Sequence, residues 1–316
     1  MADLHGVLSI LSGAFKPQKI MSKTAVLFPG QGSQKVGMGA EHAQNNPAFK
    51  KRLDQANEVL GYSLSEIMFS GPDDLLRQTE YTQPAIFLHS IALFETLDLK
   101  PGMVAGHSLG EFSALVASKA LDFEDAILLV SNRGKLMQLA GKQNPGTMAA
   151  VIGMDDEAVE KICSTATTDM SNIVVPANYN SPGQLVISGH EPAIDAALEG
   201  LKELGCKIAK KLPVSGAFHS PLMQPAFDGL REQLEAVKMH EPVCPVYSNY
   251  TAKATTNPEQ LRSNVLNQLL NPVLWTQTLF QMEKDGASEF IEVGPGNVLQ
   301  GLVKRTLKSV EIKGYQ

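Results

Sequence analysis

The sequence predicts an α/β protein with a large domain around a mostly parallel sheet and a small subdomain inserted in it. Short, continuous apolar runs at 24–28 and 103–105 are typical of buried parallel strands. They alternate with segments of helical periodicity, and this alternation indicates a parallel sheet flanked by helices. From residue 146 the order of expected elements changes, which indicates the separate subdomain.

The first part of the large domain carries its elements in strand–helix alternation. In chain order they are a strand at 24–28, a loop at 29–33, helices at about 47–60 and 83–97, a strand at 103–105, and a helix at 111–120. The spacing of Phe49, Leu53, Ala56 and Leu60 predicts the first helix. We expect Pro84 near the start of the second, where proline is tolerated.

The inserted segment reads strand, helix, strand, strand, helix, strand. These elements are expected at 148–152, 155–164, 173–175, 184–188, 191–204 and 207–212. Their order is ferredoxin-like, and we place the subdomain at 146–212. The large domain then comprises 21–145 and 213–316, and it closes with a strand at 290–293, a turn at 294–296 and a helix from 297.

Composition excludes several classes of protein. Of the 316 residues, 43% are hydrophobic and 19% charged, which predicts an ordinary globular core. The net charge of −6 disfavours general nucleic-acid binding. No apolar run approaches the ~20 residues of a membrane span. Cys163, Cys206 and Cys244 are far apart, which predicts neither a disulfide framework nor a cysteine zinc site and favours a reducing, cytoplasmic location.

Residues 1–20 form an N-terminal appendage in this interpretation. They have no basic segment followed by a long apolar one, so a signal peptide is disfavoured. Met21 precedes the first strand and is a candidate start site. A short docking helix at 1–20 is the alternative.

The segment Gly106-His107-Ser108-Leu109-Gly110 fits G-x-S-x-G between a strand and a helix. This is the context of a nucleophile elbow, in which a sharp turn exposes the serine hydroxyl near a helix N-terminus. The elbow makes the large domain α/β-hydrolase-like. Alone it indicates only serine acyl-enzyme chemistry, which lipases, esterases and acyltransferases share. We expect the His107 side chain to point away from Ser108 and to pack locally.

A serine nucleophile needs a base. Among seven histidines, His219 has the most suitable context, because it lies in a loop of small residues between an expected strand and a helix. Other motifs fail. The loop from Gly30 begins like G-x-G-x-x-G but has Lys35 in the sixth position, and there is no H-E-x-x-H. We therefore expect no metal and no retained cofactor.

Five motifs, in the same order along the chain as in the family, resemble those of malonyl-CoA:acyl carrier protein transacylases. These are the stand-alone enzymes of bacterial-type fatty acid synthesis. They are Gly30-Gln31-Gly32-Ser33-Gln34, Gly106–Gly110, the region of Arg133, Gly216-Ala217-Phe218-His219-Ser220, and Glu292-Val293-Gly294-Pro295-Gly296. The resemblance covers about residues 21–308. It implies transfer of malonyl from malonyl-CoA to acyl carrier protein, with coenzyme A as part of the substrate.

The resemblance also implies a role for each site residue. Ser108 carries the malonyl ester, and His219 acts as general base and then general acid. The backbone N–H groups of Gln31 and Leu109 form the oxyanion hole. The carbonyl of Gln268 holds His219 in place of a triad carboxylate. Arg133, 25 residues after Ser108, binds the malonyl carboxylate, since a guanidinium grips a carboxylate through two parallel hydrogen bonds; we group Arg133 and Gln268 as substrate-binding.

Alternatives remain at this stage. A serine esterase or thioesterase uses the same elbow, an acyltransferase of a polyketide pathway uses the same chemistry, and a non-catalytic interaction protein can keep the fold. We expect a monomer without nucleic-acid or membrane partners. Two basic groups are candidate docking patches for coenzyme A or an acidic carrier protein: Lys202, Lys207, Lys210 and Lys211, and Lys304, Arg305 and Lys308.

Overall fold

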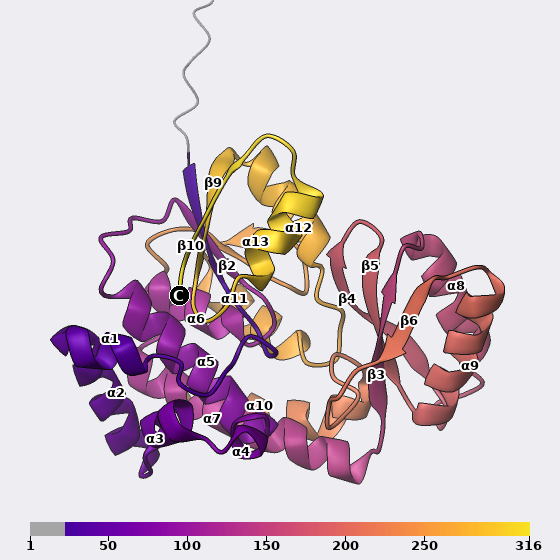
Figure 1. Ribbon diagram of the computed structural model, residues 1–316, viewed down its shortest axis with the longest axis horizontal. Coiled ribbons are helices and arrows are strands. Elements are labelled where there is room, and N and C mark those ends of the chain that lie inside the picture. Colours follow the sequence, from indigo (N-terminus) through magenta and orange to yellow (C-terminus); the bar gives the residue numbers. More distant parts are fainter. Residues whose placement is uncertain (1–22) are drawn as a thin grey trace, which may run out of the picture.

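The structure, a computed structural model, describes residues 23–316 and contains two sheets side by side (Figure 1). The predictions for residues 1–20 and for Met21 lie outside the described residues. The larger sheet has six strands in the order β10-β9-β1-β2-β7-β8. The strands are β1 (Lys23–Phe28), β2 (Met103–Gly106), β7 (Val246–Tyr247), β8 (Ala254–Thr255), β9 (Ala287–Val293) and β10 (Glu311–Tyr315). All neighbours are parallel except β7 and β8, so the predicted fold class is confirmed.

The central strand β1 shows why this sheet reads as continuous apolar runs. Val26 and Phe28 face one buried cluster, whereas Ala25 and Leu27 face another on the opposite side of the sheet. Because a strand alternates its side chains between faces, burial on both faces requires apolar residues at every position.

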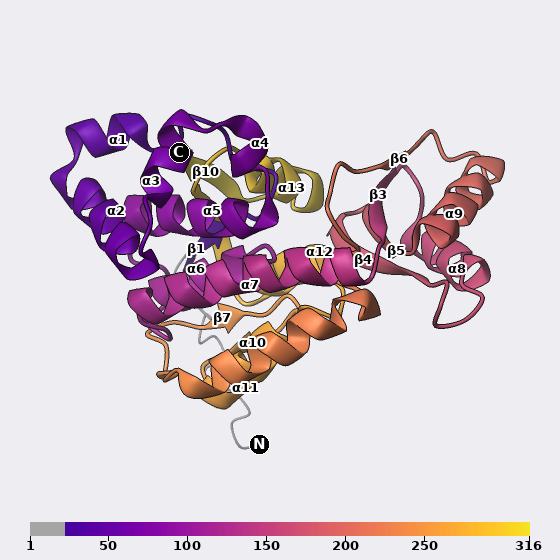
Figure 2. The same ribbon diagram turned by 90° about the horizontal axis from the view of Figure 1, so that it is seen from below.

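Helices cover both faces of the large sheet. They are α1 (Ala40–Asn45), α2 (Pro47–Leu60), α3 (Leu64–Ser70), α4 (Asp73–Leu76), α5 (Thr79–Phe94), α6 (Gly110–Ala117), α7 (Phe123–Gln143), the 3-10 turn η1 (Pro221–Met223), α10 (Gln224–Ala236), α11 (Pro258–Asn267), α12 (Trp275–Lys284) and α13 (Val298–Thr306). The long helix α7 lies between α5 and α10 (Figure 2). Within residues 23–316, no helix combines the length and apolar character needed to cross a membrane.

The smaller sheet is antiparallel, with the order β4-β5-β3-β6. Its elements are β3 (Thr147–Ile152), α8 (Asp156–Ala166), β4 (Val174–Ser181), β5 (Gln184–Gly189), α9 (Glu191–Glu203) and β6 (Ile208–Lys211). This strand order is that of a split βαβ, ferredoxin-like unit. Our division of the chain at residues 146 and 212 remains a prediction.

One loop of the large domain joins the two sheets. Val273 donates its N–H to the carbonyl of Ala177 and accepts the N–H of Tyr179 through its own carbonyl. Both partners lie on β4, so this strand is attached to the large domain by backbone hydrogen bonds. One wall of the cleft between the sheets is therefore fixed.

Three expected boundaries were wrong. Helix α5 begins at Thr79, four residues before the predicted start, and Pro84 lies inside it. This helix is buried on nearly all sides, so it has no amphipathic pattern that marks its ends. The strand expected at 173–175 is longer, because β4 extends to Ser181. The chain closes with β10 rather than a helix; β10 is a mostly exposed edge strand without an apolar run.

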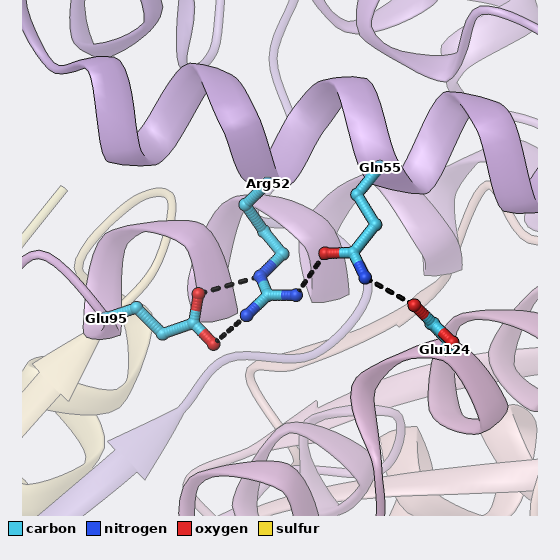
Figure 3. Close-up of polar contacts among 4 residues, drawn as sticks. All are labelled: Arg52, Gln55, Glu95 and Glu124. Carbon is cyan, nitrogen blue, oxygen red and sulfur yellow. Dashed lines mark hydrogen bonds and ion pairs between the residues drawn. The ribbon is translucent and has the colours of Figure 1, made fainter.

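A polar cluster fastens three helices at the surface (Figure 3). Arg52 of α2 donates from Nε to Oε2 of Glu95 at 2.7 Å and from Nη2 to Oε1 of the same carboxylate. Its Nη1 donates to Gln55, and Gln55 donates to Glu124 in the first turn of α7. The guanidinium also lies 4.2 Å from the ring centroid of Phe123. Arg52 is thus fully engaged by the protein itself.

Candidate active site

Ser108 lies at a sharp turn between β2 and α6, with a φ of 51°. A left-handed conformation is costly for a residue with a side chain, and it persists only where the surroundings enforce it. Here two glycines allow the turn. A Cβ on Gly106 would lie 1.9 Å from the backbone of Gly110, and a Cβ on Gly110 would lie 2.2 Å from the carbonyl oxygen of Phe28. Close backbone packing therefore explains both glycines of the G-x-S-x-G motif.

The structure brings Ser108, His219 and Gln268 together in a chain of hydrogen bonds. Nδ1 of His219 lies 2.8 Å from the carbonyl oxygen of Gln268, which only accepts, so Nδ1 carries the proton. Nε2 of the neutral ring is then the acceptor for the hydroxyl of Ser108, at 2.8 Å. The three residues thus lie within hydrogen-bond distance of one another, and their catalytic roles remain a prediction.

His219 is buried in this position, with 3% of its surface exposed. Burial, and then the positive charge of Arg133, lower the pKa of its imidazole to about 3. The hydrogen bond to Gln268 opposes this shift. The ring is therefore neutral at neutral pH and has a free lone pair for the proton of Ser108.

Arg133 reaches the same serine from α7. Its Nη2 donates to Oγ of Ser108 at 3.2 Å and to Oε1 of Gln268 at 2.9 Å, and its Nη1 donates to Oε1 of Gln83 at 2.6 Å. The side chain is 1% exposed. Burial lowers the pKa of the guanidinium to about 10, which leaves it cationic at neutral pH.

The partners of Arg133 are all uncharged. Among residues 23–316, no carboxylate lies within ion-pair distance of its guanidinium, and its Nε–H is buried without an acceptor. Buried cations are costly unless they are paired. The arrangement therefore favours a ligand that brings a carboxylate to this side chain.

A cavity of about 240 Å³ opens at Ser108 between the two sheets. Gln31 and Leu109 line it together with Ser108 and His219. Within the described part of the chain, no acceptor pairs with the backbone N–H of Gln31 or Leu109. Both donors are therefore free to bind an oxygen atom in the cavity.

The remaining walls of this cavity come from both parts of the molecule. The large domain contributes Val298, Leu299 and Leu302 of α13, and the smaller sheet contributes Asn178, Asn180, Gln184 and Val186. A mostly apolar wall with a few polar groups is typical of a small-molecule site. Among the described residues, no three His, Cys, Asp or Glu side chains are grouped to hold a metal ion; the absence of a cofactor stays a prediction.

His107 is bound by the smaller sheet rather than by Ser108. Its Nε2 lies 2.9 Å from Oδ1 of Asn180, so Nε2–H is the donor. The ring packs against Trp275, with 5.4 Å between the centroids. Burial lowers the pKa of His107, so the ring is neutral. Its contacts fit the expected local packing.

Four site residues escaped the sequence interpretation: Gln83, Glu111, Asn180 and Asn249. Gln83 was assigned only to a helix. Glu111 follows the elbow and was assigned only to the helix expected at 111–120. Asn249 comes after the two-residue strand β7, which is too short for a detectable pattern. Asn180 lies within β4, in a segment that the sequence suggests is a turn, and nothing in its local pattern distinguishes it.

The motif 292–296 is explained by support of the cavity wall. The carboxylate of Glu292 accepts the N–H groups of Leu299 and Gln300, each at 3.1 Å, at the start of α13. A carboxylate is favourable there because helix N-termini leave unpaired donors. Gly294 has a φ of 144°, and a Cβ there would collide with Pro29 and Ser90. Both features fix the loop beside the cavity.

Known proteins resemble this chain over most of its length. A family model described as "Acyl transferase domain" matches residues 26–315. The malonyl CoA-acyl carrier protein transacylase of Escherichia coli (strain K12) is 42% identical over 294 residues, covering 92% of this chain and 94% of that protein. The protein of the same name from Staphylococcus aureus (strain MRSA252) is 41% identical over 297 residues, with 94% and 96% covered.

Solved structures similar to this chain are also malonyl transferases. The acyl carrier protein S-malonyltransferase of Vibrio cholerae O1 biovar eltor has a TM-score of 0.89 and 43% identity, covering 93% of this chain and 97% of that one. A complex of a type II PKS acyl-carrier protein with its malonyl-transacylase has a TM-score of 0.89 and 40% identity, with 93% and 96% covered. The chain therefore belongs to the acyl transferase domain family, and within it to the malonyl-CoA:acyl carrier protein transacylases.

Proposed function

We propose that this enzyme transfers the malonyl group of malonyl-CoA to the phosphopantetheine thiol of acyl carrier protein, through a malonyl ester of Ser108, for fatty acid synthesis. One observation carries the proposal. The hydroxyl of Ser108 donates to the neutral ring of His219. The buried Arg133, which has no carboxylate partner in the described part of the chain, lies 3.2 Å from the same oxygen. A nucleophile, its base and a receptor for an acidic acyl group thus meet at one atom.

In the first half-reaction, Oγ of Ser108 attacks the thioester carbonyl carbon, and Nε2 of His219 takes the hydroxyl proton. The ring becomes an imidazolium whose Nδ1–H still donates to the carbonyl of Gln268. That carbonyl takes the orienting role of the aspartate in a serine triad. The thioester oxygen becomes an oxyanion, which accepts the N–H groups of Gln31 and Leu109.

The oxyanion then collapses, and the carbon–sulfur bond breaks. His219 gives its proton to the departing thiolate of coenzyme A, and the malonyl group remains on Ser108. In the second half-reaction, the carrier-protein thiol loses its proton to His219, attacks the ester, and releases Ser108 as the hydroxyl when His219 returns the proton. Both halves use one site, so ping-pong kinetics follow.

Arg133 selects the acyl group. The malonyl carboxylate replaces uncharged partners of a buried cation with a charged one, whereas an acetyl group leaves the cation as it was. Charge-assisted, two-pronged pairing with a carboxylate is the strongest hydrogen bonding that arginine offers. Discrimination between malonyl and acetyl then comes from this single side chain.

The relatives support a transferase rather than a hydrolase with the same elbow. The proteins from Escherichia coli and Staphylococcus aureus are both named as malonyl transacylases. The neighbour solved with a type II PKS carrier protein is itself named a malonyl-transacylase, so the chemistry is shared between the two pathways. The apolar cavity wall supports protection of the ester from water.

Further parts of the proposal concern the protein's surroundings. We place the enzyme in the cytoplasm as a monomer; the free thiols of Cys163, Cys206 and Cys244 support a reducing compartment. Of the two basic groups, the one on and after α13 is better placed for carrier docking, because α13 lines the cavity. In the other group, Lys211 is already paired with Asp195.

The test is product analysis. Wild-type enzyme incubated with malonyl-CoA and holo acyl carrier protein should form malonyl-carrier protein faster than free malonate, measured by mass spectrometry of the carrier protein and quantification of malonate. Predominant free malonate with no acylated carrier protein would contradict the transferase and support the hydrolase.

A further inference from the structure

Glu111 is a buried carboxylate that the proposed mechanism does not use. It lies in the first turn of α6, three residues after Ser108, and is 1% exposed. Its Oε2 accepts the backbone N–H of Asn249 at 3.1 Å and an Nε2–H of Gln268 at 2.6 Å. Burial raises the pKa of Glu111 to about 7, and these hydrogen bonds and the charge of Arg133 oppose that shift. The carboxylate is thus held by residues that themselves contact the reacting groups.

The first branch of this network leads to the backbone of Ser108. Asn249, whose N–H is held by Glu111, accepts the N–H of Ser108 through Oδ1 at 2.7 Å. Its Nδ2 donates to the carbonyl of Gly106, also at 2.7 Å. One amide side chain therefore clamps both sides of the left-handed turn, and Glu111 fixes the position of that amide.

The second branch leads to Arg133. The side-chain amide of Gln268 directs its oxygen to Nη2 of Arg133 at 2.9 Å and its NH₂ group to Glu111. The same NH₂ group donates to the carbonyl of Ser108 at 3.1 Å. A reversed amide would place N–H donors against the guanidinium and an oxygen against the carboxylate. In its ionised form, which prevails above its pKa of about 7, Glu111 therefore fixes which way this amide points.

We propose that Glu111 is a positioning residue, which acts through Gln268 to aim Arg133 at the acyl group and through Asn249 to hold the turn at Ser108. The inference rests on the proposed function. It makes acyl selectivity depend on a carboxylate that touches neither substrate nor the reacting atoms. Gln268 then has two roles, since its backbone carbonyl orients His219 and its side chain orients Arg133.

The test is the substitution Glu111→Gln, which keeps the shape and an acceptor oxygen but removes the charge. We expect the ratio of kcat/KM for malonyl-CoA to kcat/KM for acetyl-CoA to fall about tenfold, within the range for residues of one hydrogen-bond network. The same substitution in an Arg133→Met background should leave the ratio unchanged, because the residue through which Glu111 acts is gone.

The matched control is Glu292→Gln. Glu292 is equally buried and accepts two backbone N–H groups, but outside this network. Because Glu292 supports the cavity wall but does not contact Arg133, this substitution should lower the thermal midpoint, change the rates with both acyl groups in proportion, and keep the wild-type ratio. If Glu111→Gln does not fold, Gln268→Met removes the relay amide, retains the backbone carbonyl, and should lower the ratio in the same way.

Two results would overturn the inference while leaving the proposed function intact. One is a Glu111→Gln enzyme that slows both acyl groups equally. The other is a double variant in which Glu111→Gln and Arg133→Met each lower the ratio by the same factor as they do alone. A wild-type enzyme that forms no malonyl-enzyme would instead refute the proposed function itself.

Discussion

Arg52 and Arg133 are both arginines on long helices, with opposite surroundings. Arg52 is 22% exposed at its side chain, and its guanidinium makes a two-pronged pair with the carboxylate of Glu95 (Figure 3). Arg133 is 1% exposed, and its partners are two amide oxygens and a hydroxyl. The arginine at the surface pairs with a carboxylate, whereas the buried arginine has no carboxylate partner among residues 23–316.

The difference separates a structural arginine from the proposed receptor for the malonyl carboxylate. A pair that the protein completes by itself has nothing further to gain from a ligand. A buried cation with neutral partners gains most from an arriving carboxylate, because its alternative pairing is poor. Glu111 is close enough to oppose the pKa shift of Arg133 but is separated from it by Gln268, so it does not occupy the binding edge.

The largest expected effect comes from Arg133→Met. Losing one partner of a buried charge pair should lower kcat/KM for malonyl-CoA by roughly 10²–10³-fold, with a much smaller change for acetyl-CoA. Steady-state kinetics with both thioesters measure this. Equal losses for the two substrates would mean that Arg133 does not read the acyl carboxylate.

A smaller effect is expected on the pH profile. Burial and the charge of Arg133 lower the pKa of His219 to about 3, so its base form persists on acidification. The acid limb of kcat/KM for acyl transfer should therefore lie well below pH 6.5. Removing the cation in Arg133→Met raises this pKa and moves the limb upward, whereas Arg52→Met leaves it in place. Profiles of kcat/KM from about pH 3 to pH 8 measure these limbs. Three superimposable limbs would contradict the contrast between Arg133 and Arg52.

The smallest effect is expected from Arg52→Met. The variant keeps an apolar contact with Phe123 and loses an ion pair that is partly exposed, so the free energy of unfolding should fall by about 1 kcal/mol or less. Denaturant unfolding measures it, and the malonyl-to-acetyl ratio serves as the control. A change in that ratio would show that Arg52 is not merely structural.

The sequence was informative where local chemistry alone determines structure. The elbow at Ser108 was predictable because any side chain in place of its two glycines would collide with the backbone. Strand β1 was predictable because both of its faces are buried, which requires a continuous apolar run. The contacts of Arg133 were not predictable. They depend on Gln83, Glu111 and Gln268, which lie 50, 22 and 135 positions away in the chain and meet only in the fold.

The edge strand β10 escaped prediction, and the start of the predicted helix α5 was misplaced, for a related reason. Strand β10 is mostly exposed, and α5 is buried almost all round, so neither has the alternation or stripe that reveals an element. Asn249 depends on β7, a strand of two residues. A periodic pattern of apolar residues predicts a helix or strand only when one face of that element is buried and the element is long enough for the pattern to repeat.

Intact-mass analysis after incubation with malonyl-CoA tests the central claim most directly, with wild type and Ser108→Ala in parallel. The account predicts that the wild-type chain gains the mass of one malonyl group, that the adduct disappears when holo acyl carrier protein is added, and that Ser108→Ala gains nothing. No adduct on the wild type, or an equal adduct on Ser108→Ala, would contradict it.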